Sequence, residues 1–208
     1  MSDNDDWLVL DENAKDWLVL DENAKSWTLT TEGFGKAQSI GTLVLQSVFV
    51  PGGTTDEGRI VRAVAAPWRR IVDHLLQNRD SMYEIPARVW EEIVATAYKE
   101  AGFDEVILTP RSRDFGRDVI ATKRGLGTVR VIDQVKAYRP GHVVTADDVR
   151  AILGVLHLDG ASKGFVTTTS DFAPRLLDDP LIEPLIPSRV ELINGTQLLA
   201  RLKELRSQ

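Results

Sequence analysis

Helical and strand-like spacings of apolar residues alternate along the second half of the chain. One helical stripe consists of Trp90, Ile93 and Ala97, which recur three or four residues apart. Pro86 can open this helix and Gly102 can end it, because proline suits a first helical turn and glycine suits the position after the last one.

Short apolar runs separated by turn residues predict the strands, at 105–109, 164–169, 190–193 and twice within 116–136. Helical spacings begin at Thr145 and at Thr196, and a helix broken by three prolines is predicted over 172–186. The order is helix, three strands, helix, strand, helix, strand, helix. It predicts an α/β fold, a mixed sheet flanked by helices on both faces.

The N-terminus carries a tandem repeat. The decapeptide Asp-Trp-Leu-Val-Leu-Asp-Glu-Asn-Ala-Lys occupies 6–15 and 16–25, and Ser26-Trp27 begin a degraded third copy. Each copy joins an apolar run to a turn, which predicts a small β-meander as an N-terminal extension. Two units fall short of a solenoid, so the repeat receives no function.

Residues 26–80 give a weaker pattern. The apolar run over 40–50 fits a strand or a helix, and from Asp56 onward the spacing predicts a helix with a break or kink at Pro67. A polar stretch follows and predicts a linker. The expected boundaries are 1–25 for the acidic repeat, 26–80 for an accessory region of unknown role and 81–208 for the main domain.

The two strands within 116–136 form a predicted hairpin that carries the residues with candidate chemistry. Gly-Leu-Gly supplies the permissive backbone of its turn. If Lys123 pairs with Thr128 across that turn, the antiparallel register places Asp118 opposite Asp133.

A carboxylate, an amide and an ammonium group can therefore meet at the open end of the hairpin. Gln134 follows Asp133 directly and shares a strand face with Lys136, because side chains alternate along a strand. The Asp118 carboxylate can hold a hard divalent cation, and the lysine can steer a water or offset charge on a phosphate. This set indicates metal-assisted hydrolysis of a phosphodiester, with an ordinary hairpin of solvated charges as the alternative.

Charge is distributed unevenly over the 208 residues, whose formal net charge is −6. Residues 1–25 hold eight acids and two bases, whereas 111–139 hold eight bases and three acids. A local excess of +5 around the hairpin suits a surface that binds phosphate, although a solvated hairpin can show the same excess.

Composition indicates the class of protein, the metal sites it excludes and the expected location. Hydrophobic residues make up 43% of the chain and charged residues 27%, as in ordinary globular proteins. There is no cysteine, which excludes disulfides and thiolate metal sites. No apolar run approaches the length of a membrane span, and the acidic N-terminus is unlike a signal peptide. We therefore expect a cytoplasmic protein that does not bind membranes.

Five motifs stand in order between residues 83 and 205: Trp90-Glu91 with the helix end Ala101-Gly-Phe103, Arg113-Asp-Phe-Gly-Arg-Asp118, Gln134-Val-Lys136, Lys163-Gly-Phe-Val-Thr-Thr-Thr169 with Phe172, and Ile193-Asn-Gly-Thr-Gln-Leu198. Together they resemble the Mrr-type restriction endonuclease domain of the PD-(D/E)xK nuclease superfamily. Val135 stands where that family often has cysteine. Gln134 replaces the second acid of the wider superfamily, as it commonly does in this family. The first 80 residues resemble no family.

The resemblance implies a restriction-endonuclease-like fold and hydrolysis of DNA phosphodiester bonds with Mg²⁺ or, alternatively, Mn²⁺. Asp118 would be the main metal ligand, and Gln134 and the Val135 carbonyl would complete the coordination by protein. Glu91 would contact the metal directly or through water. Lys136 would orient or activate the attacking water.

DNA is the expected partner, and Arg113, Arg117 and Arg139 are its expected contacts. Cutting both strands with one site per chain requires a dimer or repeated visits, so a homodimer is also expected. The leading hypothesis is an Mrr-like (type IV) DNA endonuclease in restriction or in defence against foreign DNA. The alternatives are a non-cleaving DNA-binding module of the same fold, and a repair or junction-resolving nuclease.

Overall fold

The computed structural model describes residues 17–21, 26–30, 42–45, 48–110 and 116–207. Contacts divide the chain into two compact units, Met1–Ser47 and Val48–Gln208. No helix in the described part of the chain is long and apolar enough to cross a membrane.

The first unit contains a small antiparallel sheet in the order β2-β1-β3, with β1 at Trp17–Asp21, β2 at Ser26–Thr30 and β3 at Thr42–Leu45. Strands β1 and β2 are the apolar runs of the second repeat copy and of the degraded third copy, and they pair antiparallel as the meander predicts. Strand β3 pairs with β1 and not with β2, so the order of the described strands differs from that of a meander. The first copy lies outside the described residues.

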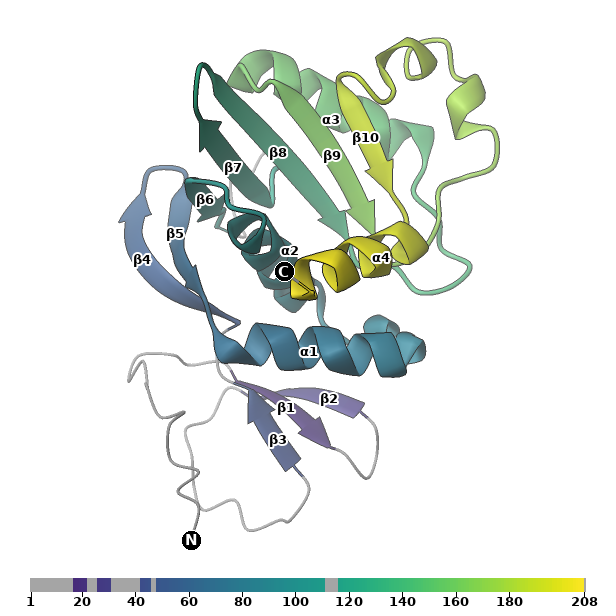
Figure 1. Ribbon diagram of the computed structural model, residues 1–208. Coiled ribbons are helices and arrows are strands. Elements are labelled where there is room, and N and C mark those ends of the chain that lie inside the picture. The colour runs from purple at the N-terminus through teal and green to yellow at the C-terminus, as the bar shows by residue number, and fades with distance from the viewer. Residues whose placement is uncertain (1–16, 22–25, 31–41, 46–47, 111–115, 208) are drawn as a thin grey trace, which may run out of the picture. The chain divides into compact units, whose positions relative to one another are not determined.

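The second unit is built on a seven-stranded mixed sheet in the order β10-β9-β8-β7-β6-β5-β4 (Figure 1). The strands are β4 Phe49–Thr55, β5 Gly58–Val64, β6 Glu105–Leu108, β7 Val119–Arg124, β8 Thr128–Lys136, β9 Lys163–Thr168 and β10 Val190–Ile193. Neighbours from β4 to β8 are antiparallel, whereas β8, β9 and β10 run parallel to one another. The mixed sheet of the α/β prediction is confirmed.

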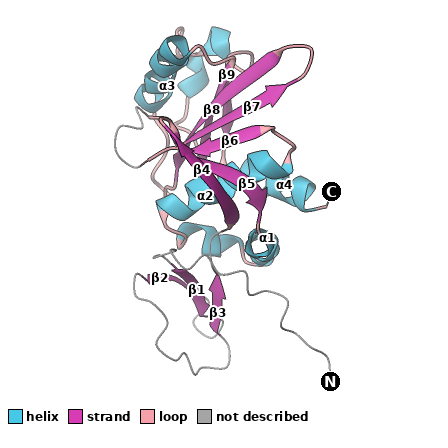
Figure 2. Ribbon diagram, turned by 90° about the vertical axis from the view of Figure 1, so that its left-hand side faces the viewer, coloured by secondary structure: helices cyan, strands magenta, loops and turns pink. Residues whose placement is uncertain are grey.

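Four helices accompany this sheet: α1 Ala66–Gln77, α2 Ala87–Glu100, α3 Ala146–Asp159 and α4 Gly195–Arg206. Helices α2 and α4 cover one face and α3 covers the other (Figures 1 and 2). The predicted helices over 86–101, from Thr145 and from Thr196 are therefore confirmed. Thr145 and Asn194 cap α3 and α4 with their side chains, which satisfies backbone N–H groups at the helix starts.

Burial of apolar side chains on the two faces holds the layers together. One cluster joins the sheet to α3 and includes Ile107, Ile120, Ile132, Val149, Ile152 and Leu156. On the other face, Trp90 and Ile93 of α2 are fully buried, and the Trp90 Nε1 donates to the Met82 carbonyl at 2.9 Å. Each strand of the hairpin thus has its two faces buried against different helices.

Two sequence predictions fail in this unit. The helix expected from Asp56 is instead strand β5, and α1 begins only at Ala66, with Pro67 in its first turn. β-Branched residues of β5 fit a strand that pairs with β6, and a proline suits a helix start because the first N–H groups need no acceptor. The broken helix over 172–186 is reduced to two short 3₁₀ turns, η2 at Leu176–Asp178 and η3 at Glu183–Leu185. A further 3₁₀ turn, η1 at Arg79–Tyr83, occupies the end of the expected linker.

The structure also places the domain boundary earlier than expected. Strands β4 and β5 extend the same sheet as the hairpin, and α1 is packed within the same unit. Trp68 of α1 is fully buried, and its Nε1 donates to the Ile93 carbonyl of α2 at 3.1 Å. The boundary therefore falls between Ser47 and Val48, and the second part of the expected accessory region belongs to the main unit.

This assignment predicts that Trp68→Ala destabilises the whole second unit. Loss of a fully buried tryptophan lowers the free energy of unfolding by about 3–5 kcal/mol. Urea denaturation followed by far-UV circular dichroism should show one transition at lower urea. The control Arg70→Ala, at an exposed position of the same helix, should leave the midpoint unchanged. A separate early transition that leaves the rest of the sheet intact would contradict the assignment.

Candidate functional site

The hairpin places Asp118 opposite Gln134. The observed register pairs Arg124 with Thr128 and Val119 with Asp133. Continuing it by one residue sets Asp118 against Gln134, so the predicted pairing of Asp118 with Asp133 is wrong by one position. The reason is the turn, which contains three residues instead of the four that the predicted register implied.

Asp118, Gln134 and Lys136 share one face of the sheet. Side chains alternate along a strand, and Ile132, two residues before Gln134, belongs to the cluster packed against α3. Ile120, two residues after Asp118, belongs to the same cluster. The structure therefore brings together three of the four residues predicted to be catalytic.

The Asp118 carboxylate is held by the main chain of β8. The Val135 N–H donates to Asp118 Oδ2 at 2.7 Å, and the Asp118 N–H donates to the Asp133 carbonyl at 3.0 Å. The Asp118 carbonyl accepts from the N–H of Thr109, the residue after β6, also at 3.0 Å. These bonds fix the carboxylate at the end of β8.

Gln134 supplies a buried oxygen with an unused lone pair. Its Oε1 is buried and has no hydrogen-bond partner among the described residues. Gly116, at a φ of +77°, lies so close that a Cβ there would stand 3.2 Å from Gln134 Nε2. An unsatisfied buried acceptor costs about 1–3 kcal/mol, so an oxygen kept in this state beside a carboxylate fits a ligand for a cation.

Val135 offers its main-chain carbonyl on the same side as Asp118. Its buried side chain lies on the opposite face from Gln134, as expected. Carbonyls of neighbouring residues in a strand point to opposite edges, and the Lys136 carbonyl accepts from the Thr169 N–H after β9. The Val135 carbonyl therefore points toward β7, the side from which Asp118 comes.

Lys136 is tied to the start of α3. Its Nζ lies 3.4 Å from Asp148 Oδ1, while Asp148 Oδ2 accepts from the N–H and hydroxyl of Thr145 at 2.9 and 2.8 Å. Burial alone would raise the pKa of Asp148, but the hydrogen bonds from Thr145 and the nearby ammonium lower it overall. Asp148, which the sequence did not single out, thus stays charged beside the lysine.

Glu91 joins this site indirectly. Arg88 Nη1 contacts Glu91 Oε2 at 2.6 Å and donates to the Thr109 carbonyl at 2.9 Å. Since the Thr109 N–H binds the Asp118 carbonyl, the helix acid is connected to Asp118 through Arg88 and Thr109. Arg88 is a second residue that sequence reasoning missed.

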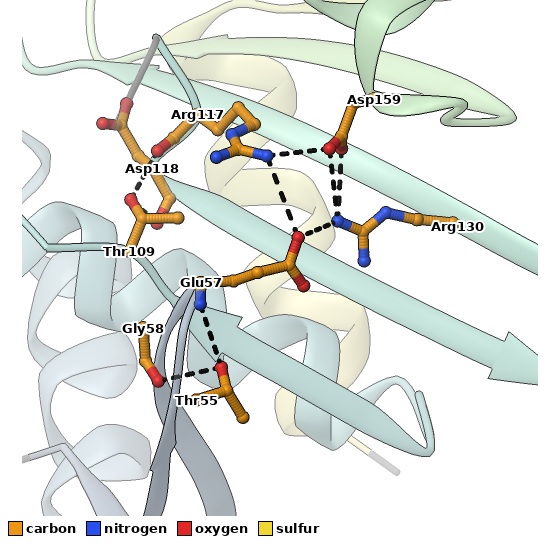
Figure 3. A network of polar contacts seen from close by, with 8 residues as sticks. All are labelled: Thr55, Glu57, Gly58, Thr109, Arg117, Asp118, Arg130 and Asp159. Carbon is orange, nitrogen blue, oxygen red and sulfur yellow. Dashed lines mark hydrogen bonds and ion pairs between the residues drawn. The ribbon is translucent and has the colours of Figure 1, made fainter. Parts of the chain in front are cut away.

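The three expected DNA contacts differ in position. Arg113 lies outside the described residues. Arg139 is exposed just after β8. Arg117 is engaged within the protein, because its Nη1 lies 2.7 Å from Asp159 and 3.8 Å from Glu57 (Figure 3). We therefore remove Arg117 from the proposed contacts.

The basic excess around the hairpin is largely balanced by acids from other parts of the chain. Four of its bases pair with such acids: Arg117 and Arg130 with Glu57 and Asp159, Arg124 with Glu105, and Lys136 with Asp148. A count along the chain does not include these partners. The hairpin itself is therefore less positive than its sequence suggests.

Asp133 lies on the other face of the sheet, toward α2. It is 1% exposed, and its Oδ2 accepts from the Tyr98 hydroxyl at 3.0 Å and from Thr167 Oγ1 at 2.9 Å. Burial raises the pKa of Asp133 to about 7, and the nearby Asp118 carboxylate also raises it, against the lowering effect of the two hydroxyl bonds. The signal in the sequence was an acid that alternates with Val131 and Val135, two apolar residues that are both buried on this face.

The residues present fit a hard divalent cation. The candidate donors are one carboxylate, one amide oxygen and one main-chain carbonyl, which are the oxygen ligands that Mg²⁺ and Mn²⁺ prefer. Within the described ranges there is no group of three or more histidine, cysteine, aspartate or glutamate residues that could hold a metal ion. A metal here would therefore depend on Gln134 and Val135 in addition to Asp118.

The family model described as restriction endonuclease, Mrr_cat, matches residues 82–202. Two solved structures share 19% sequence identity with the chain. The MspJI restriction endonuclease in complex with a 27-mer oligonucleotide gives a TM-score of 0.42 over 69% of this chain and 34% of its own. The DNA modification-dependent restriction endonuclease AspBHI gives 0.46 over 68% and 36%. The chain thus spans about a third of the length of each. No curated protein matches the sequence.

The buried Asp133 predicts an unusual dependence of stability on pH. Its pKa is about 7 in the folded protein and about 4 in the unfolded chain, so folding carries no penalty below pH 4 and the full penalty above pH 7. The free energy of unfolding should therefore fall between these pH values, by an amount on the order of 4 kcal/mol.

The free energy of unfolding of Asp133→Asn should not show this decrease, because asparagine does not titrate. The measurement is the difference in free energy of unfolding between wild type and variant, from urea denaturation in EDTA across pH 4–8. Curves that stay parallel across this range would show that Asp133 is not a buried titrating group.

Proposed function

The chain belongs to the restriction endonuclease family whose model matches residues 82–202, and we propose that it is a metal-dependent DNA endonuclease in restriction or defence against foreign DNA. The observation that carries this proposal is the position of Asp118 opposite Gln134, with Lys136 on the same strand face. A hairpin of merely solvated charges would not require the Gln134 Oε1 to be buried without a hydrogen-bond partner in the described part of the chain.

In this proposal Asp118, Gln134 Oε1 and the Val135 carbonyl hold Mg²⁺ or Mn²⁺. When bound, the cation supplies charge stabilisation to the phosphate and to the attacking and leaving oxygens. The main-chain bonds of Asp118 keep its carboxylate in place, so little has to reorganise when the substrate arrives.

Lys136 orients the attacking water and offsets the negative charge that develops on the phosphate. Asp148 holds the ammonium at the end of β8, and α3 fixes Asp148 through its capping bonds. A charged group held in one position contributes more than a freely moving one, because its orientation is set before the reaction.

Glu91 contributes from α2. Arg88 engages its Oε2, so we assign Oε1 to a contact with the cation, directly or through water. Arg113 and Arg139 contact the DNA backbone, and a homodimer supplies the second site needed to cut both strands.

Purified protein should nick or cut plasmid DNA in Mg²⁺, and Asp118→Ala or Lys136→Ala should reduce the rate at least about 10²-fold by removing groups that act on the transition state. Agarose electrophoresis of supercoiled plasmid measures this. The control Asp147→Ala removes an exposed carboxylate from the neighbouring helix and should leave the rate unchanged. Circular dichroism should show that all variants remain folded.

The same assay also tests the alternative function. Wild-type protein that binds plasmid but cuts neither modified nor unmodified DNA, in Mg²⁺ or Mn²⁺, would favour a non-cleaving DNA-binding module of this fold.

Asp148→Asn should separate positioning of Lys136 from stability of α3. The amide can still accept the capping bonds from Thr145, but it removes the charge beside the lysine, so turnover should fall about 10-fold or more. Thr145→Ala removes the hydroxyl bond to Asp148 but keeps the bond from the main-chain N–H and the charge beside the lysine. It should lower the free energy of unfolding by about 1 kcal/mol and reduce turnover less than Asp148→Asn does. Equal turnover for Asp148→Asn and wild type would mean that the ion pair plays no part in catalysis.

A further inference from the structure

Four charged side chains from four separate segments point toward one another near the start of β7 (Figure 3). They are Glu57 in the β4–β5 turn, Arg117 before β7, Arg130 on β8 and Asp159 at the end of α3. Arg130 Nη2 lies 2.5 Å from Glu57 Oε1 and 3.3 Å from Asp159 Oδ2. Together with the two contacts of Arg117, these pairs form a network with no net charge.

The network is partly withdrawn from water. Side-chain exposure is 11% for Asp159, 16% for Arg117, 23% for Arg130 and 36% for Glu57. Charges in this setting depend on their partners more than surface charges do, because removing one partner leaves the other poorly solvated. Glu57 is the member that comes from farthest away in the sequence.

The β4–β5 turn is shaped so that Glu57 reaches this position. The Glu57 N–H donates to Thr55 Oγ1 at 3.3 Å, and the same hydroxyl donates to the Gly58 carbonyl at 3.2 Å (Figure 3). Gly58 has a φ of +146°, and a Cβ there would lie only 2.3 Å from the Leu108 carbonyl of β6. Only glycine permits so close an approach of the turn to the end of β6.

Arg117 connects this network to the site. Its side chain is held by Asp159 and Glu57, and its carbonyl accepts a hydrogen bond from Thr109 Oγ1. The next residue is Asp118, whose carbonyl accepts from the Thr109 N–H at 3.0 Å. The main chain at Arg117 and Asp118 is therefore fixed by the ion pairs of the Arg117 side chain and by the hydrogen bonds from Thr109, the residue after β6.

We propose that Glu57 is a positioning residue for Asp118 and acts through Arg117. This inference rests on the proposed function of Asp118 as a metal ligand. It extends the site beyond residues 82–202, the segment that the family model matches, to a hairpin that precedes it. The β4–β5 hairpin is then part of the machinery that prepares the metal site.

Glu57→Gln tests the proposal, because the amide keeps the size of the side chain and removes its charge. Mn²⁺ binding without DNA, followed by electron paramagnetic resonance of the free ion, should weaken about 10-fold, as expected when a group that supports a metal ligand is lost. The Mg²⁺ concentration for half-maximal plasmid cleavage should rise by a similar factor. Gly58→Ala keeps the carboxylate but displaces the turn, and should weaken Mn²⁺ binding in the same direction.

Glu105→Gln is the matched control. It breaks the Glu105–Arg124 pair, 3.1 Å long, on the same sheet. Glu105 is 38% exposed, against 36% for Glu57, so the two substitutions remove carboxylates of similar exposure. Arg124, at 56%, is more exposed than Arg117 at 16%, and the Glu105 pair does not involve Arg117. Mn²⁺ binding by Glu105→Gln should equal that of wild type.

The outcomes separate this inference from the proposed function. Wild type that binds Mn²⁺ and cleaves, with Glu57→Gln equal to it in both, would overturn the role of Glu57 alone. A loss of Mn²⁺ binding no larger than the unfolded fraction measured by urea denaturation would also overturn it, because the role would then be structural. Wild type that neither binds Mn²⁺ nor cleaves would overturn the proposed function itself.

Discussion

The hydrogen bond from the Val135 N–H to the Asp118 carboxylate fixes the geometry on which the candidate site depends. It joins the start of β7 to the end of β8 and sets Asp118 opposite Gln134. Both strands lie inside the seven-stranded sheet, so their positions are determined by β6 and β9 on either side. A site assembled from main-chain bonds inside a sheet is rigid, which favours preorganised charge stabilisation.

The side chains of strand β8 lie in two different environments. Gln134 and Lys136 project toward α3, whereas Asp133 projects toward α2 and is buried among hydroxyl groups. The Asp118 charge raises the pKa of Asp133, after the larger effect of burial, so the two faces are coupled electrostatically through one strand. The buried Asp133, close to the candidate site, thereby lowers the free energy of unfolding at neutral pH. Such a compromise is often found where function constrains a fold.

The hairpin and the helices that flank the sheet could be predicted because periodicity, turn residues and caps are local signals. The register could not, since a turn of three or four residues was compatible with the same sequence and the choice shifted Asp118 by one position. Likewise, β5 has apolar residues that fit a helix or a strand, and its pairing with β6 decided between them. Asp148, Arg88 and Glu57 were missed because they meet the hairpin only through the fold.

The proposed function depends on a metal site formed together by Asp118, Gln134 and the Val135 carbonyl. The most direct measurement is the anomalous difference density of a crystal grown with Mn²⁺, which locates the ion independently of cleavage. The proposed metal site predicts a peak bounded by these three residues, whose oxygens are the ligands that Mg²⁺ and Mn²⁺ prefer. A peak elsewhere on the molecule, or none here at saturating Mn²⁺, would contradict it.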